Sequence, residues 1–152
     1  MNNTAFNFTY AKVKDVKSPV RGTSLSAGVD FFVPNDFNPQ TIEPGESIFV
    51  PSGIKVKIPN NYALIAFNKS GVSLKKNLDI GACVVDSDYQ GEIHLHLFNV
   101  GNVPTTIMPG EKLVQFLLMP IDLSTPHEVS VEDLYRSTSE RGTGGFGSTG
   151  TA

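Results

Sequence analysis

Short apolar segments with a period of two, separated by turns that contain proline and glycine, restrict the possible folds of this chain more than any other feature. Residues 6–10, 54–58 and 93–97 alternate apolar and polar side chains, as a half-buried β-strand does. The turn sequences VPND, EPGE, PNN and MPGE lie between such segments, in a chain of 152 residues with 14 Gly and 10 Pro. This pattern predicts an all-β sandwich, jelly roll or barrel of about eight or more short strands.

Helical periodicity is weak. We expect a turn or two of helix at residues 70–77, with Ser70 as a candidate N-cap, and a second short helix near residues 131–134. From Ser137 onward the composition changes to STSERGTGGFGSTGTA, in which Phe146 is the one large apolar residue. We therefore predict a β domain over residues 1–136 and a mobile tail over 137–152. By itself such a tail is either a linker or a segment that folds over a ligand.

Size, charge and cysteine content exclude several classes. The length fits one domain, the net charge of −3 provides no global attraction for nucleic acid, and no run of about 18 apolar residues is present to span a membrane. The start of the chain, MNNTAFNFTY, does not have the order of a signal peptide. A single cysteine, Cys83, excludes an intrachain disulfide and a cysteine-rich zinc site. We expect a cytoplasmic, reducing location, which would be the host cytoplasm for a viral protein.

Asp86 is the first candidate for a catalytic residue. It follows the apolar run GACVV and precedes the alternating segment IHLHL, an order that predicts a hairpin. A carboxylate at the end of an apolar strand is expected to be partly desolvated, which raises its pKa and makes it a better base. The alternative is that Asp86 and Asp88 are ordinary turn residues.

Two further segments have the composition of phosphate-binding sites. In RGTGGFGSTG, residues 141–150, the backbone N–H groups of the glycines, the Arg141 guanidinium and the Ser148 and Thr149 hydroxyls are donors to phosphate, and Phe146 can stack on a base. No lysine follows these glycines as it does in a P-loop. In NKSG, residues 68–71, a cation, a hydroxyl and backbone donors follow an apolar strand. The alternative for NKSG is an ordinary helix cap.

His94 and His96 point to one face of the predicted strand, as a pair of metal ligands would. Cupin jelly rolls hold a metal with His-x-His and a following Glu, but no Glu follows within the next several residues here. We therefore expect these histidines to form the polar face of a strand.

The order of these segments carries more information than any one of them. The chain reads AGVD at 27–30, KSG at 69–71, VDSDYQG at 85–91, GEKLVQ at 110–115 and RGTGGFGSTG at 141–150. This resembles the five ordered motifs of the trimeric dUTPase family, the deoxyuridine 5′-triphosphate nucleotidohydrolases, over residues 10–150. The resemblance implies a jelly-roll-like β fold and a homotrimer with three active sites at subunit interfaces. It also implies hydrolysis of dUTP to dUMP and pyrophosphate, which limits uracil in DNA and supplies dUMP for dTMP synthesis.

Roles carry over from the family by position. Asp86 matches the carboxylate that activates the water attacking the α-phosphorus, and Tyr89 matches the aromatic residue beneath the deoxyribose. The backbone around Cys83 and His94 matches the segment that pairs with the uracil edge. A Mg²⁺ ion is implied, held mainly by phosphates and water, with Asp30 as possible outer-shell support and no direct protein ligand. No stable nucleic-acid or membrane partner is implied.

The remaining matches concern the phosphates and the tail. Ser70 and Gln115 match phosphate contacts, and Arg141 matches a charge-neutralising residue. Phe146 matches the aromatic residue that covers the uracil ring. The other matched substrate-binding residues are Lys69, Gly71, Gly147, Ser148 and Thr149. The family usually has Arg where this chain has Lys69, often after a Pro where this chain has Asn68. Lysine cannot make a bidentate contact, so we expect this segment to hold a phosphate through a point charge.

Two other interpretations remain. A dCTP deaminase, or a bifunctional deaminase–dUTPase, shares the fold but needs a catalytic Glu at the position where this chain has His96. A non-catalytic structural or regulatory jelly-roll protein would fit the composition, although it would not need Asp86, Tyr89 and an intact glycine-rich tail together.

Overall fold

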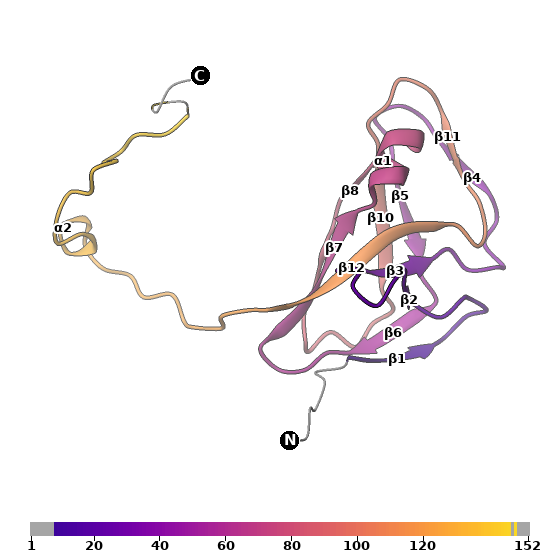
Figure 1. Cartoon of the computed structure of the whole chain (residues 1–152), viewed down its shortest axis with the longest axis horizontal. Coiled ribbons are helices and arrows are strands. Elements are labelled where there is room, and N and C mark those ends of the chain that lie inside the picture. Colours follow the sequence, from indigo (N-terminus) through magenta and orange to yellow (C-terminus); the bar gives the residue numbers. More distant parts are fainter. Residues whose placement is uncertain (1–7, 147, 149–152) are drawn as a thin grey trace. The chain divides into compact units, whose positions relative to one another are not determined.

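The structure is a computed structural model that describes residues 8–146 and 148 (Figure 1). The chain divides into two compact units, Met1–Asp122 and Leu123–Ala152. The strands of the first unit are β1 (Thr9–Lys12), β2 (Val20–Arg21), β3 (Val29–Phe32), β4 (Gln40–Ile42), β5 (Ser47–Pro51), β6 (Ile54–Lys57), β7 (Tyr62–Asn68), β8 (Leu78–Ile80), β9 (Val84–Val85), β10 (His94–Asn99), β11 (Thr105–Ile107) and β12 (Lys112–Pro120). One helix, α1 (Ser70–Lys76), lies between β7 and β8. The prediction of an all-β fold is confirmed.

The largest sheet has five antiparallel strands in the order β2-β3-β12-β7-β9. Its centre is β12, the long strand that crosses the first unit in Figure 1 between β3 and β7. Leu113, Val114 and Phe116 of β12 are buried, and Phe116 packs against Phe31 of β3 with ring centroids 4.6 Å apart. An apolar central strand is expected because its neighbours on both sides satisfy its backbone while its side chains enter the core.

A three-stranded sheet, in the order β5-β10-β8, brings a second set of apolar residues to the same core. On β10, Leu95 and Leu97 are buried, whereas His94 and Phe98 on the opposite face are exposed. The predicted period of two in this segment is therefore confirmed. Two ribbons, β1-β6 and β4-β11, complete the pairing of strands in the part of the chain that the structure describes.

The two turns of sequence PGE close in the same way. Glu46 accepts a hydrogen bond from the backbone N–H of Glu43, and Glu111 accepts one from that of Met108, both at 2.9 Å. The intervening glycines have positive φ angles, 83° at Gly45 and 76° at Gly110, which a residue with a Cβ rarely adopts. The sequence thus encodes these turns locally, through hydrogen bonds between residues three apart.

The predicted hairpin around Asp86 is wrong. Strand β9 pairs with β7, with Val85 opposite Leu64, whereas β10 pairs with β5 and β8. After Ile80 the chain leaves the β10 sheet and crosses to the other sheet, so two segments adjacent in sequence belong to different sheets. Alternation shows which face of a strand is buried, but it carries no information about the neighbouring strand.

Both predicted helices are present. The first begins after Lys69, which is its N-cap, so the prediction of Ser70 as cap is wrong by one residue. In the second unit, α2 (Val131–Leu134) is capped by Ser130, whose hydroxyl accepts a hydrogen bond from the Asp133 N–H at 3.2 Å. No helix among the described residues is long and apolar enough to cross a membrane.

Candidate active site

A pocket of about 190 Å³ in the first unit is lined by residues from both the five-stranded and the three-stranded sheet. It contains four residues that the sequence singles out: Cys83, Asp86, Tyr89 and His94. The other lining residues are Phe49, Ala82, Val84, Val85, Ile93 and Phe116. The volume is below the range of roughly 300–1,000 Å³ of drug-sized ligand pockets, so the pocket suits a single planar ring rather than a whole nucleotide.

Sequence reasoning missed Phe49, which lies on β5 next to the pocket. A signal was present in the sequence, because Phe49 occupies a position of the alternating segment 47–51 where an outward-facing polar side chain is expected. In the structure Phe49 is indeed 56% exposed. An exposed aromatic residue in that phase is more informative than an exposed aliphatic one because it offers a flat surface for stacking.

Asp86 follows β9, which is the edge strand of the five-stranded sheet. Its carbonyl accepts the Tyr89 N–H at 3.2 Å and so closes a turn that presents the carboxylate at the pocket. The expected partial desolvation is wrong for the isolated chain, in which Asp86 is exposed. The reason is that an edge strand has no neighbour on its outer side to cover the residue that follows it.

Tyr89 is fixed by the same turn. Its hydroxyl donates a hydrogen bond to the Glu92 carbonyl at 2.9 Å. Gly91 leaves the necessary room, because a Cβ on Gly91 would lie 2.2 Å from the Tyr89 hydroxyl oxygen and 2.4 Å from Cζ. The Tyr89 ring is therefore held at the pocket by its hydrogen bond to Glu92, and it fits there because Gly91 has no side chain.

We predict that Gly91→Ala displaces the Tyr89 ring from the pocket. If the ring lies beneath the deoxyribose, discrimination between dUTP and UTP falls by about tenfold, the scale of a small steric change in a binding pocket. The ratio of kcat/KM for the two nucleotides measures the effect. Gly22→Ala is the control, since its Cβ would meet only the Ser26 hydroxyl at an ordinary 3.4 Å. Unchanged selectivity in the Gly91 variant would contradict the prediction.

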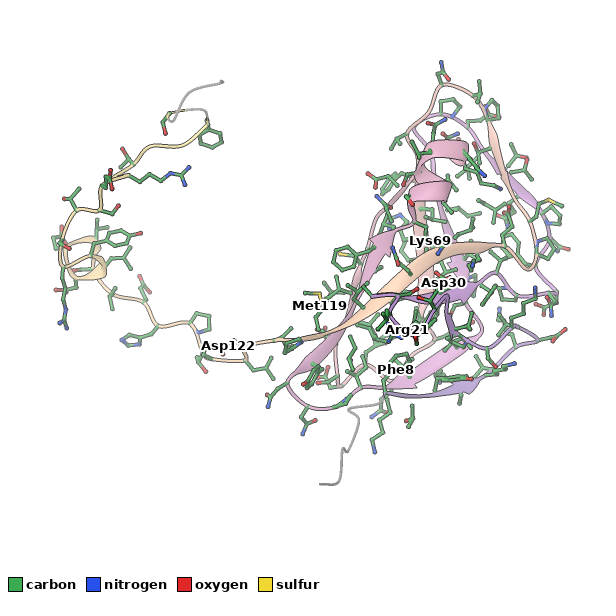
Figure 2. The ribbon with its side chains drawn as sticks, in the orientation of Figure 1. Phe8, Arg21, Asp30, Lys69, Met119 and Asp122 are labelled. Carbon is green, nitrogen blue, oxygen red and sulfur yellow. The ribbon has the colours of Figure 1, made fainter. Side chains whose placement is uncertain are left out.

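A second cluster gathers around Asp30, a buried carboxylate on β3. Lys69 contacts one carboxylate oxygen, and Lys112 lies 3.1 Å from the other. Figure 2 shows Asp30 and Lys69 side by side although 39 residues separate them in sequence. A buried charge needs such partners because its desolvation is otherwise costly. Lys112 was not among the predicted residues, although it stands within the segment GEKLVQ.

Gln115 joins the same region. Its side-chain amide donates a hydrogen bond to the Asn68 carbonyl at 2.7 Å, and it lies opposite Asp30 in the β3–β12 register. Gly28 fits against it closely, since a Cβ there would lie 2.2 Å from the Gln115 side-chain oxygen. Arg21 holds the preceding loop by donating to the Ser26 and Ala27 carbonyls at 2.5 and 2.8 Å. The segments 27–30 and 110–115 thus meet across the paired strands β3 and β12, and Lys69, between the end of β7 and the start of α1, contacts Asp30 there.

We predict that Asp30→Asn destabilises the fold by about 1–3 kcal/mol, because it leaves two ammonium groups without their carboxylate. The loss is below that for a fully buried pair, since Lys69 and Lys112 are partly exposed and water screens them. Chemical denaturation measures the change. Lys69→Arg is the matched variant: it keeps the ion pair and is expected to be neutral for stability and neutral or beneficial for activity. Equal losses of stability in both variants would rule out a role for the pairing itself.

The structure places the remaining predicted residues as follows. Ser70 and Gly71 are exposed at the start of α1. In the second unit, Arg141 donates through Nε to the Gly144 carbonyl at 2.9 Å, and Phe146 and Ser148 are exposed. Gly147 and Thr149 lie outside the described residues. Within residues 8–146 and 148, no group of three His, Cys, Asp or Glu side chains is arranged to hold a metal ion.

Known proteins of one family are similar to this chain over most of its length. The model of the dUTPase family matches residues 14–150, nearly the whole chain. The chain belongs to the dUTPase family. Within it, the deoxyuridine 5′-triphosphate nucleotidohydrolase of Paraburkholderia phymatum is 38% identical over 135 residues, which cover 87% of this chain and 88% of that protein. The corresponding enzyme of Fowlpox virus is 34% identical over 149 residues, which cover 93% and 96% of the two chains.

Solved dUTPase structures share the fold. The dUTPase of Staphylococcus bacteriophage 80alpha with dUpNHpp superposes with a TM-score of 0.82 at 26% identity, over 95% of this chain and 99% of that one. The five segments identified in the sequence all lie within residues 14–150, the region that the family model matches. Residues of segment 85–91 line the pocket, and residues of segments 27–30, 69–71 and 110–115 form the cluster around Asp30.

Proposed function

We propose that this dUTPase-family protein hydrolyses dUTP to dUMP and pyrophosphate by attack of water on the α-phosphate. The observation that carries the proposal is the meeting of Asp86, Tyr89 and the Cys83 and His94 segments in one pocket, although they derive from different strands and loops. Asp86 is the general base. It is the carboxylate that lines the pocket, and it lies at the open edge of a sheet, where a phosphate and a water molecule can approach it.

Base selection rests on the backbone around Cys83 and His94. The Cys83 carbonyl already accepts the Ala66 N–H at 2.8 Å, which fixes this segment to β7. A fixed backbone presents one donor and acceptor pattern, so cytosine, with a different edge from uracil, leaves buried polar groups unpaired. The small pocket leaves no room for the 5-methyl group of thymine, and Tyr89 beneath the sugar rejects a 2′-hydroxyl.

The triphosphate is bound in the region of the second cluster and by the tail. Two ammonium groups around the single carboxylate of Asp30 leave an excess of one positive charge, and Ser70, Gly71 and Gln115 supply neutral donors nearby. The tail adds the backbone donors of its glycines. The tail residues proposed to close over the substrate are Arg141, Phe146, Gly147, Ser148 and Thr149.

Mg²⁺ accompanies the substrate in this proposal. Both carboxylate oxygens of Asp30 face lysines, so this residue suits outer-shell support rather than direct ligation. When bound by the phosphate oxygens and water, the ion neutralises charge that develops on the triphosphate. The protein supplies the base, the pocket and the positive charge of Lys69, Lys112 and Arg141.

A homotrimer with shared active sites completes the proposal. Two observations favour association with further copies. On the outer face of β5 and β10, Phe49 and Phe98 are 56% and 37% exposed around His96. In the second unit, Val131, Tyr135 and Phe146 are exposed apolar residues. Exposed aromatic surface of this kind is typical of protein interfaces. The tail of one subunit would then cover the pocket of another, within a jelly-roll-like trimer located in the cytoplasm.

Release of pyrophosphate tests the function directly. The purified protein is incubated with dUTP, dTTP, dCTP and UTP, with and without Mg²⁺. We expect release from dUTP with Mg²⁺ and little from the other three nucleotides. Formation of dUTP or dUMP from dCTP would indicate the deaminase, and no turnover of any nucleotide would indicate a non-catalytic protein. Light scattering on the same sample tests the trimer.

A further inference from the structure

We propose that His96 is a positioning residue of the base pocket. In this role its neutral imidazole holds residues 81–83 where Ala82 and Cys83 form the pocket wall. The inference rests on the proposed function in one respect, namely that the pocket binds the uracil ring. It concerns a residue that lies outside the pocket lining and outside the five motif segments.

Residues 81–83 carry the chain from one sheet to the other, and each is anchored differently. The Gly81 N–H donates to the His96 carbonyl at 3.0 Å, which extends the pairing of β8 with β10 by one residue. The Cys83 carbonyl accepts the Ala66 N–H of β7 at 2.8 Å. Between them, the Ala82 N–H donates to Nδ1 of the His96 ring at 2.8 Å. Backbone groups thus hold Gly81 and Cys83, whereas a side chain, that of His96, holds Ala82 between them.

This hydrogen bond determines the state of the ring. An imidazole nitrogen accepts a hydrogen bond only when it carries no proton, so His96 is neutral with its proton on Nε2. His94, two residues earlier on the same strand, has the opposite arrangement. Its Nδ1 lies 3.0 Å from the Glu92 carbonyl, which can only accept, so that nitrogen carries the proton. The two histidines thus have different roles, although they share a face of β10.

The surroundings hold the His96 ring in place. Phe49, opposite His96 on β5, stacks on it with ring centroids 4.2 Å apart and an interplanar angle of 28°. Phe98 packs against it at 4.8 Å. On the other side Gly81 leaves room for the ring, since a Cβ there would lie 2.1 Å from Nδ1. Phe49 and Ala82 both line the pocket, so His96 contacts two residues of the pocket wall.

Two substitutions of His96 distinguish the effect of its hydrogen-bond acceptor from the effect of its aromatic ring. His96→Asn keeps an acceptor, because its amide oxygen stands at the same position along the side chain as Nδ1, but it loses the ring. His96→Phe keeps an aromatic ring against Phe49 and loses the acceptor. Tyr10→Leu is the control, since it changes an exposed aromatic residue of β1, a strand that pairs with β6 and contributes no residue to the pocket lining.

The expected result is a split between KM and kcat. His96→Phe raises the KM for dUTP and lowers discrimination against dCTP by about five- to tenfold, the scale of one hydrogen bond, with kcat within about twofold of the parent. His96→Asn and Tyr10→Leu stay within about threefold of the parent in both constants. Light scattering and thermal melting on each variant confirm an unchanged assembly and fold.

A second readout does not depend on turnover. In His96→Phe without substrate, hydrogen exchange at the Ala82 amide accelerates by about tenfold, while His96→Asn retains its protection. Equal KM and exchange in His96→Phe and parent, or an equal loss in His96→Asn and His96→Phe, would overturn the proposal. If the parent does not hydrolyse dUTP, the proposed function fails, and the exchange measurement still decides whether His96 holds the loop.

Discussion

Asp86→Asn is expected to lower kcat for dUTP hydrolysis by about 10²–10⁴, the usual contribution of a general base. Asn keeps the size of the side chain, and the backbone carbonyl of residue 86 still closes the turn, but the amide cannot take a proton from water. Binding of dUTP to the variant should persist, because the base and phosphate contacts come from other residues. Turnover measured by pyrophosphate release and binding measured by calorimetry separate the two effects.

Asp88→Asn is the matched control. Asp88 is also an exposed carboxylate of the same turn, but it does not line the pocket. Both variants remove one negative charge from the same segment, so a general electrostatic effect on the triphosphate would appear equally in both. We expect Asp88→Asn to stay within about threefold of the parent, a change of less than 1 kcal/mol in the barrier. Similar losses in both variants would refute the assignment of Asp86 as base.

Deletion of residues 137–152 is expected to leave a folded protein with kcat/KM for dUTP reduced by at least about 10²-fold, the loss that follows removal of one preorganised donor. The tail supplies Arg141, Phe146 and several backbone N–H groups in the proposed closed site. The core lies in Met1–Asp122, and all its buried residues precede the deletion. Circular dichroism and thermal melting should therefore show little change.

Phe146→Ala tests the same idea with a smaller change. The side chain is fully exposed, so its removal has no cost in the folded chain. If it stacks on the uracil ring, the KM for dUTP rises by about tenfold, in line with the roughly 1–3 kcal/mol of base–aromatic stacking. A truncated protein with parental turnover would show that the tail is a linker only.

Much of the fold was predictable because its signals are local. Period-two alternation identified the strand that contains Leu95 and Leu97, and the PGE turns close through bonds between residues three apart. Both short helices stand within a residue of their predicted bounds. The neighbours of each strand were not predictable in the same way. The segment before Asp86 joins β7 rather than β10, a choice made by packing between distant segments.

Some residues of the candidate site were likewise predictable from the sequence, and others were not. The order of the five motifs led to Asp86, Tyr89, Lys69 and Gln115, and the structure brings these residues into two neighbouring clusters. The residues that position them are less visible in the sequence. Lys112 completes the ion pairs of Asp30, and His96 holds the Ala82 N–H. Each acts through one contact between segments that are separated in the sequence, and a single contact of this kind produces no periodic pattern along the chain.

The sequence by itself determined the class of fold, the positions of the turns and the family, because alternation, turn chemistry and motif order are properties of neighbouring residues. Only the tertiary structure decided that Asp30 is buried between two lysines, that Asp86 stands exposed at a sheet edge, and that a histidine ring supports the pocket wall. The physical reason is that burial and charge pairing depend on which segments become neighbours in space, and strand pairing over long sequence separations sets those neighbours.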